Sequence, residues 1–251
     1  MRFASLGSGS KGNATLVQAG DTLVMVDCGF SLRETTRRMQ RLGVEPEQLS
    51  AVLVTHEHSD HSAGVARLSK RHGIPVYLTH GTAASGRCDG SHDLTCINGD
   101  DSMQIGELAV RAVAVPHDAR EPCQFRFSWS GRELGLLTDL GCITPHVIEQ
   151  YRDCHSLLLE FNHDSGMLQD GPYPPSLKRR VGGDWGHLNN RQAVEFLRNI
   201  NAGGLNHLVV AHISEQNNCR DRAQSALGEV LAETVNLVWA DQAEGFGWLG
   251  V

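Results

Sequence analysis

The sequence predicts an α/β fold in a single domain, residues 1–251. With 40% hydrophobic residues, a chain of 251 residues can bury one sizeable core. A strand, a helix and a second strand follow one another around residues 52–78, which favours a parallel βαβ unit. The order strands, helices, strands, helices along the whole chain suggests two similar halves packed face to face.

The first half opens with two short strands joined by the Gly/Ser-rich loop 7–13. This loop is either a flexible connection or, with Lys11, a site for a phosphate group. Glycine at position 43 is expected to end the first helix. The predicted strands are residues 1–6, 14–17, 22–26, 52–54 and 74–78, and the predicted helices are residues 31–42 and 63–72.

The second half begins after the polar stretch 80–96, which shows no clear pattern. Residues 165–186 are rich in Gly and Pro, and we expect a long functional or mobile loop there. Asn189 is the expected N-cap of the helix that follows. The predicted strands are residues 102–115 with a break at Gly106 and Glu107, 124–129, 133–137, 156–161, 208–211, 237–240 and 245–249, and the predicted helices are residues 144–151, 190–200 and 221–233.

The most informative stretch contains His56, His58, Asp60 and His61, three histidines and one aspartate within six positions. They follow an apolar strand, which would deliver them to its C-terminal end. Imidazole and carboxylate groups are good ligands for zinc and similar divalent ions. His56 and His58 would fall on one side while Asp60 and His61 come round as the chain turns, so this segment can serve two adjacent ions. A solvated loop is the alternative for any two of them.

The same pattern recurs at three other predicted strand ends. His117, Asp139 and His212 each stand just beyond an apolar strand. Any one of them alone could be a turn residue, but together with the central motif they predict a dinuclear site along one sheet edge. Asp27 also ends a strand, and we expect it to orient a ligating histidine from behind.

Charge limits the partners of this protein. A formal net charge of −7 argues against indiscriminate binding to nucleic acid or anionic membranes, yet it allows a locally positive groove around two cations. The only basic run is Lys178, Arg179 and Arg180. These residues would contact backbone phosphates, or they form a plain solvated face.

The sequence predicts a soluble, cytoplasmic protein that is not bound to a membrane. No basic segment precedes an apolar run at the start, and nowhere do eighteen apolar residues run together. Seven scattered cysteines, without a Cys-x-x-Cys pair, indicate reduced thiols. Cys88, His92 and Cys96 could hold an accessory zinc ion, although their spacing is unfamiliar and loop residues are the simpler interpretation.

The His-x-His-x-Asp-His motif behind a strand resembles the signature of the metallo-β-lactamase fold superfamily. This resemblance implies a four-layer αββα sandwich of two mixed sheets. It also implies two divalent metal ions, zinc or manganese. By this likeness His56, His58 and His117 would hold one ion, Asp60, His61 and His212 would hold the other, and Asp139 would bridge them.

Three further stretches, residues 8–15, 186–190 and 211–218, resemble the YycJ/WalJ-type branch, which is related to RNase Z and includes DNA exonucleases. The resemblance implies a phosphodiesterase that acts on DNA, in which a metal-bridging hydroxide attacks the scissile phosphate. Asp60 and His187 are the expected catalytic residues, with His187 facing the scissile phosphate. Asn189, an expected substrate contact, stands where Ser is common in the branch.

Two other functions fit the same metals. One is a small-molecule hydrolase, either a cyclic phosphodiesterase or a thioesterase. The other is a non-catalytic scaffold that binds metal only to fold. The substrate, the polarity of digestion, the native metal and the oligomeric state, a homodimer included, stay open at this point.

Overall fold

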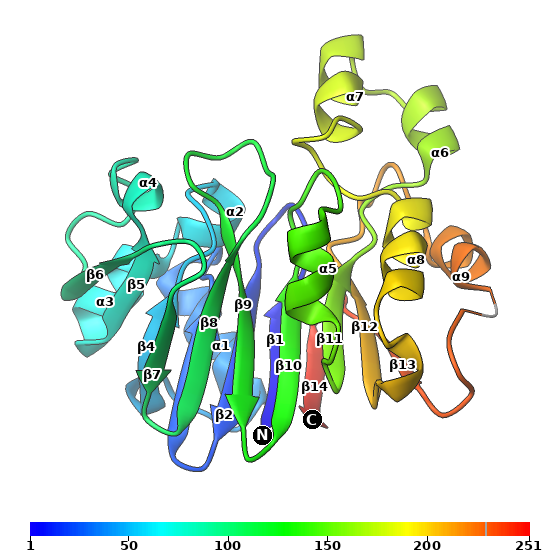
Figure 1. Ribbon diagram of the computed structural model, residues 1–251. Coiled ribbons are helices and arrows are strands. Elements are labelled where there is room, and N and C mark those ends of the chain that lie inside the picture. Colours follow the sequence, from blue (N-terminus) through cyan, green and yellow to red (C-terminus); the bar gives the residue numbers. More distant parts are fainter. Residues whose placement is uncertain (229) are drawn as a thin grey trace.

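Two seven-stranded sheets lie face to face, and helices cover the outer face of each sheet (Figure 1). The computed structural model describes residues 1–228 and 230–251. Both sheets combine parallel and antiparallel strand pairs. The four-layer αββα sandwich expected from the sequence is therefore confirmed.

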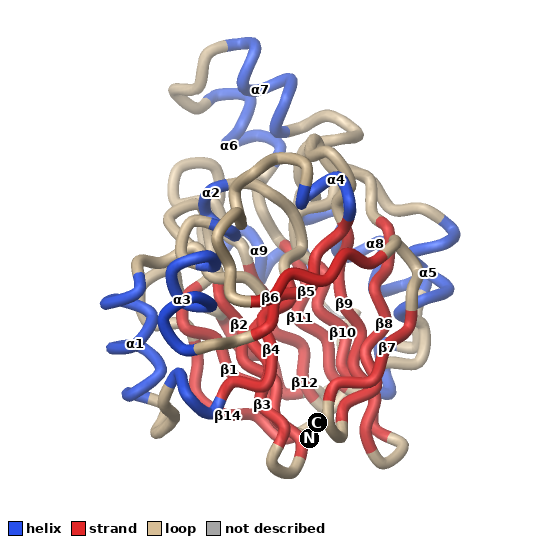
Figure 2. Tube along the Cα trace, turned by 90° about the vertical axis from the view of Figure 1, so that its left-hand side faces the viewer, coloured by secondary structure: helices blue, strands red, loops and turns tan. Residues whose placement is uncertain are grey.

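The first sheet contains strands of the N-terminal half and the last strand of the chain. Pairing is parallel from β3 (Thr22–Val26) to β6 (Asp93–Ile97), whereas β1 (Arg2–Gly7) pairs antiparallel with both neighbours. The two termini consequently lie close together (Figures 1 and 2). The strand order is β14 (Phe246–Gly250), β1, β2 (Ala14–Ala19), β3, β4 (Leu49–Leu53), β5 (Pro75–Thr79) and β6.

The second sheet, like the first, consists of an antiparallel half and a parallel half. Strands β10 (Arg132–Leu137) to β13 (Asn236–Trp239) pair in parallel, and β7 (Ser102–Ile105) to β10 pair antiparallel. The strand order is β13, β12 (His207–Ala211), β11 (Ser156–Glu160), β10, β9 (Cys123–Trp129), β8 (Leu108–Ala114) and β7.

Helices α6 and α7 project beyond the body of the molecule, while the longer helices pack on the sheets (Figure 2). No helix in the described part of the chain combines the length and the apolar character needed to cross a membrane. The first half contains α1 (Leu32–Arg41), α2 (Ser59–Ser62), α3 (Val65–His72), α4 (His80–Ala83) and a 3-10 turn (Pro46–Gln48). The second half contains α5 (Pro145–Tyr151), α6 (Ser165–Asp170), α7 (Pro175–Val181), α8 (Asn190–Asn199), α9 (Arg220–Leu227) and a 3-10 turn (Ala202–Gly204).

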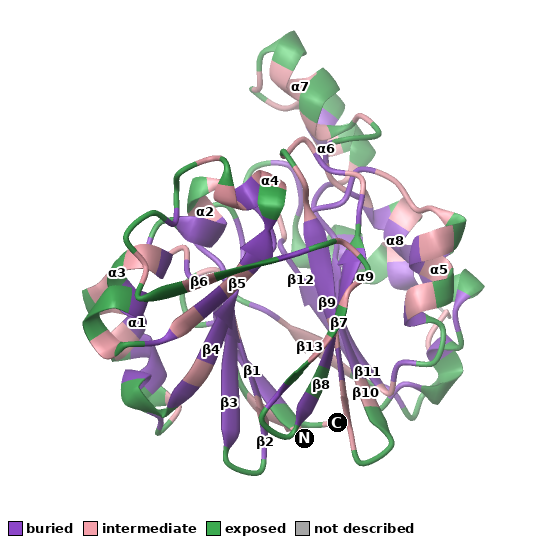
Figure 3. Ribbon diagram, turned by 60° about the vertical axis from the view of Figure 1, so that its left-hand side comes forward, coloured by how far each residue is buried: buried purple, intermediate pink, exposed green. Residues whose placement is uncertain are grey.

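Three apolar layers hold the four layers of secondary structure together. The central layer lies between the sheets and includes Phe125 and Phe127. A second layer, with Met39, fills the space between the first sheet and its helices. A third layer, with Phe196, does the same on the second sheet. Figure 3 shows that the strands around these layers are mostly buried, because each sheet is covered on both faces.

The prediction of a long loop at residues 165–186 is wrong, because this segment folds into α6 and α7. The Asp164 carboxylate caps α6 by accepting a hydrogen bond from the Met167 N–H at 2.9 Å. Pro175 occupies the first position of α7, where its missing N–H costs nothing. Most Gly and Pro residues of this segment lie at or near the ends of α6 and α7, and their abundance had suggested a loop.

Other boundaries also differ from the prediction. The polar stretch 80–96 contains α4 and most of β6, whose side chains are largely exposed and therefore lack an apolar pattern. The helix predicted at residues 63–72 starts at Val65, and the turn before it is α2. The helix predicted at residues 221–233 ends at Leu227, where Gly228 adopts a φ of 47°; residue 229 lies outside the described residues.

Replacing Phe125 by alanine should lower the free energy of unfolding by about 3–5 kcal/mol, because the ring is fully buried between the two sheets. Urea unfolding measures this change. The exposed Arg33→Ala variant on α1 is the control and should change the value by at most about 0.5 kcal/mol. Equal effects of the two substitutions would contradict this account of the core.

Candidate metal centre

The residues expected to bind metal stand just beyond strand ends that meet at one edge of the sandwich. His56 follows β4, His117 follows β8, Asp139 follows β10 and His212 follows β12. Asp27, Asp139 and His212 have φ angles of 60°, 52° and 53°. Residues other than glycine rarely adopt this left-handed conformation, which costs about 1–3 kcal/mol each and is concentrated at functional sites.

One group of side chains consists of His56, His58 and His117. Their ligand nitrogens all lie within 4.8 Å of one another, and His58 Nδ1 is 3.4 Å from His117 Nε2. His56 and His117 are buried, whereas the side chain of His58 is 29% exposed. Three nitrogen donors at this spacing could hold one cation.

A second group, formed by Asp60, His61 and His212, also has its ligand atoms within 4.8 Å of one another. Asp139 lies between the two groups. Its Oδ2 is 3.3 Å from His61 Nε2, and its Oδ1 is 4.0 Å from His117 Nε2. The structure therefore brings all seven expected ligands together, while their role as ligands stays a prediction.

Hydrogen bonds to Nδ1 fix the orientation of four of the histidine rings. Each bond leaves Nε2 available to the centre of the site, as is usual for metal-binding histidines. Asp27 orients the ring of His61 in this way, as expected from the sequence. The partners of Nδ1 are Thr55 Oγ1 for His56 (2.9 Å), Asp27 Oδ2 for His61 (2.7 Å), the Gly186 carbonyl for His117 (2.9 Å) and Glu160 Oε1 for His212 (2.8 Å).

Unpartnered buried atoms allow a test of whether these residues suit metal ions. His56 Nε2, Asp139 Oδ2 and His212 Nε2 are buried without a hydrogen-bond partner. Leaving such atoms unpaired costs about 1–3 kcal/mol each, so they normally have a partner. All three belong to the groups above, and their nitrogen and oxygen donors suit zinc and manganese. The residues therefore fit a pair of divalent cations.

The two groups differ in their electrostatics. Burial lowers the pKa of His56 well below its usual value and also lowers the pKa of His117. Burial acts in the same direction on His61 and His212, but the surrounding carboxylates outweigh it together, namely Asp139 and Asp60 for both rings, Asp27 for His61 and Glu160 for His212. The pKa of His61 is raised well above its usual value, and that of His212 is raised to about 10. His56 and His117 of the first group therefore present neutral imidazoles, whereas a cation at the second group displaces protons.

Glu160 is a site residue that the sequence prediction missed. It is fully buried at the end of β11, and Oε1 accepts hydrogen bonds from His187 Nδ1 (2.9 Å) and His212 Nδ1 (2.8 Å). Burial opposes ionisation, yet these two histidines lower the pKa of Glu160. A carboxylate at the end of an apolar strand is the signal that had identified Asp27, and it could have identified Glu160.

The Gly/Ser-rich loop between β1 and β2 contacts the site through Asn13. Its Nδ2 lies 3.0 Å from His61 Nε2 and 3.4 Å from Asp60 Oδ2. Lys11 instead pairs with Glu215 at 2.6 Å on the surface. The loop therefore supports the second group of ligands, and the ammonium group of Lys11 already has an anionic partner.

A cavity of about 440 Å³ opens beside the two groups. His187 lines it with a side chain that is 21% exposed, and Glu160 raises the pKa of this histidine despite its burial. Arg87 and Arg180 also line the cavity, and Arg180 pairs with Asp118. Cationic groups beside a metal centre can bind an anionic substrate.

The structure separates the four residues expected to contact substrate. Arg180 faces the metal cavity, whereas Lys178, Arg179 and Asn189 line a second cavity of about 400 Å³. Lys178 Nζ donates to the Gln169 carbonyl at 2.6 Å, and Asn189 caps α8 as predicted. The basic run is continuous in sequence but is divided between two cavities in space.

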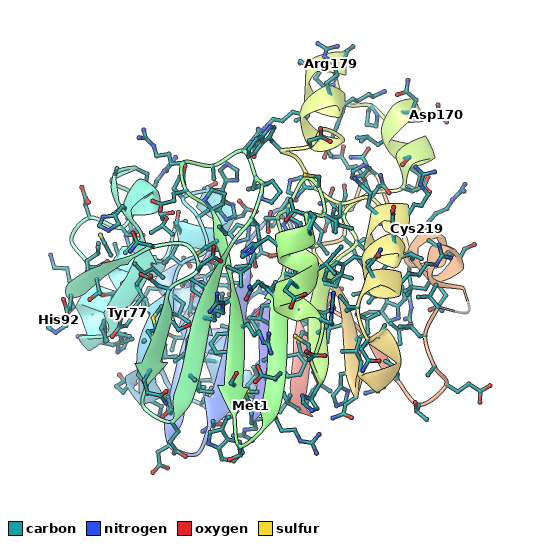
Figure 4. The ribbon with its side chains drawn as sticks, in the orientation of Figure 1. Met1, Tyr77, His92, Asp170, Arg179 and Cys219 are labelled. Atoms are coloured by element: carbon teal, nitrogen blue, oxygen red, sulfur yellow. The ribbon has the colours of Figure 1, made fainter. Side chains whose placement is uncertain are left out.

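The structure gives no support to an accessory zinc site. Cys88 is buried and Cys96 is exposed on β6, while His92 lies at the outer side of the first sheet (Figure 4). Among the groups of clustered ligand atoms in residues 1–228 and 230–251, none contains these three side chains.

The sequence matches the model of the beta-lactamase superfamily domain over residues 22–213. This match covers the central motif and extends through His212. The chain belongs to the metallo-β-lactamase superfamily. It is a hydrolase of this superfamily, as the sequence predicted.

Relatives of known name place this metallo-β-lactamase superfamily member in the YycJ/WalJ-like branch. Exodeoxyribonuclease YycJ of Bacillus anthracis is 32% identical over 238 residues, which are 93% of this chain and 90% of that protein. Exodeoxyribonuclease WalJ of Streptococcus pneumoniae is 29% identical over 239 residues, 92% of this chain and 88% of that protein. The expected branch is therefore confirmed.

Solved structures of the superfamily share the fold. YhfI of Bacillus subtilis superposes with a TM-score of 0.76 at 17% identity, over 99% of both chains. Zinc-bound PqqB of Methylobacterium extorquens superposes with a TM-score of 0.75 at 17% identity, over the full length of both chains. At this identity the comparison establishes the fold alone.

Thr55→Val should weaken metal binding by about 10–100-fold, because the hydroxyl group connects His56 Nδ1 with Asp27. Competition with a chromophoric chelator measures the affinity. Thr36→Val on α1 removes a hydroxyl that bonds only the Leu32 carbonyl and serves as the control, with unchanged affinity. An affinity equal to that of the control would show that the histidine ring does not depend on Thr55.

Proposed function

We propose that this protein is a dinuclear metal-dependent phosphodiesterase that acts on DNA as an exonuclease. The observation that carries the proposal is the position of Asp139 between two groups of ligands. Similarity to relatives named exodeoxyribonuclease over about nine tenths of both chains supports DNA as the substrate.

In the proposed assignment His56, His58 and His117 would hold one ion, Asp60, His61 and His212 would hold the other, and Asp139 would be shared by both. Zinc or manganese suits this set of nitrogen and oxygen donors. When bound, such a pair of ions brings the pKa of water towards neutrality and polarises the phosphate oxygen under attack. The structural basis is the seven clustered side chains with their unpartnered donor atoms.

The protein's own residues provide the remaining chemistry. Hydrogen bonds with His212 and His61 lower the pKa of Asp60 despite its burial, so its carboxylate can accept a hydrogen bond from the attacking water. Glu160 holds His187 through Nδ1 and favours its protonated form. The other edge of the His187 ring can then stabilise negative charge on the phosphate or protonate the leaving oxygen.

Two bound cations would make this cavity favour a phosphodiester over a neutral substrate. Arg87 and Arg180 line it together with the carboxylates of Glu57, Asp60, Asp118 and Asp139, so its net positive charge depends on the metal ions. Local positive charge of this kind makes DNA binding sensitive to salt. We place the enzyme in the cytoplasm, since all seven cysteines are free thiols, as in a reducing compartment.

A small-molecule hydrolase is the second candidate, because a cavity of about 440 Å³ also suits a small ligand. Turnover of a DNA end, a cyclic nucleotide phosphate and a thioester would separate the two functions. We expect the DNA end to be cleaved fastest in the presence of manganese or zinc, and a chelator to abolish cleavage. Faster turnover of the cyclic phosphate or the thioester would reject the nuclease. Bound metal without hydrolysis of bis(p-nitrophenyl) phosphate would indicate a scaffold.

His187→Ala should retain both metal ions but lower turnover about 10²–10⁴-fold, since its ring can act on the phosphate and is not an assigned ligand. Metal content and digestion of end-labelled DNA are the measurements. His146→Ala removes a surface histidine paired with Asp100 and should leave both quantities unchanged. Loss of one metal, or full activity on DNA and on a model diester, would contradict the proposed role of His187.

A further inference from the structure

The second cavity has the character of an anion site although it lies away from the metal-binding groups. Its volume is about 400 Å³. Two of its lining residues, Lys178 and Arg179, are cations, and none of its described lining residues is a carboxylate. Figure 4 shows Arg179 on α7, the helix that projects beyond the sheets. The lining residues are His163, Ser165, Leu168, Gln169, Lys178, Arg179, Gly182 and Asn189.

Helix α7 forms the wall between the two cavities. Leu177, Arg180 and Val181 line the metal cavity, and these positions share one helical face. Lys178 and Arg179 line the second cavity from the opposite side. The distance across a helix with its side chains is about 10 Å, so a ligand group in the second cavity lies about that far from the metal cavity.

Two further features of the second cavity point to an anion. His163 is 2% exposed, and its Nδ1 has no hydrogen-bond partner. Asn189 caps the ten-residue helix α8, whose N-terminal dipole favours negative charge. The Asn190 N–H donates to the His163 carbonyl at 2.9 Å, so the histidine is tied to the start of this helix. Burial lowers the pKa of His163 to about 4, so the ring is neutral, and its Nδ1 can donate to a phosphate in the tautomer that carries the hydrogen there. This ring nitrogen, the helix N-terminus and two cations together suit a phosphate group.

We propose that the second cavity is a subsite for a backbone phosphate of the same DNA strand whose end lies at the metal centre. This proposal rests on the proposed exonuclease function. Successive phosphates of one strand are separated by about 3.4 Å of rise in a duplex and by more along an extended single strand, so a separation of about 10 Å corresponds to at most about three nucleotides. A dinucleotide whose single linking phosphate lies at the metal centre has no further phosphate for the subsite, whereas a strand of twelve nucleotides has several.

Binding measurements with two strand lengths test the subsite. Fluorescence anisotropy of the metal-loaded protein would use a labelled dinucleotide and a labelled twelve-nucleotide strand, both with phosphorothioate linkages that resist cleavage. Lys178→Ala/Arg179→Ala should weaken binding of the longer strand about ten-fold or more and that of the dinucleotide at most about two-fold. The salt dependence of log affinity for the longer strand should decrease by about 1.4, which corresponds to two phosphate contacts on single-stranded DNA.

A matched control and a second variant make the test specific. Lys70→Ala/Arg71→Ala removes the same charges from exposed neighbouring positions at the end of α3, and it should leave both affinities unchanged. His163→Phe preserves a ring without its nitrogens and should weaken binding of the longer strand alone.

The outcomes separate the subsite from the enzymatic function. Equal loss for both lengths, no loss for either, or an equal effect of the control pair would overturn the subsite. Length-dependent binding through Lys178 and Arg179 by a protein that cleaves no DNA would retain the subsite and reject the exonuclease function.

Discussion

The carboxylate of Asp139 is the point on which the site depends, because it lies between two groups of ligands that each combine residues from both sheets. Asp139 follows a strand of the second sheet, whereas His61 belongs to the segment behind the first sheet. Burial alone would raise the pKa of this carboxyl, but His212 and His61 lower it, so the carboxylate is ionised where it is almost fully enclosed. Face-to-face packing of the sheets is therefore a condition for the site as well as for the core.

Contacts from the surrounding residues hold the residues of the site in place. Each strained residue, Asp27, Asp139 or His212, is also hydrogen-bonded or packed within the cluster, so the structure around it enforces the unfavourable φ angle. Backbone bonds add to this rigidity: Asn13 N–H donates to the Asp60 carbonyl and Cys28 N–H to the His61 carbonyl, both at 2.7 Å. Preorganised donors bind a cation without a large cost in conformational entropy.

The residues of the metal centre could be predicted from the sequence because each follows an apolar strand, and neighbouring parallel strands end at the same edge of a sheet. Glu160 follows the same rule, yet its neighbour Phe161 extends the apolar run and hides the carboxylate as part of a strand. The division of Lys178 and Arg180 between two cavities could not be inferred, since it depends on the helical twist of α7. That helix has no fully buried residue and so leaves no apolar periodicity in the sequence.

His58 differs from the other histidines of the two groups in being partly open to solvent. Its side chain is 29% exposed, compared with 1% for His61 and 3% for His212. Among the other assigned ligands Asp60 is 22% exposed, so each group has one member that is open to solvent and through which its ion would exchange. Substitution at this one ligand is thus the least disruptive route to a protein with a different metal preference, since the other rings are fixed from behind.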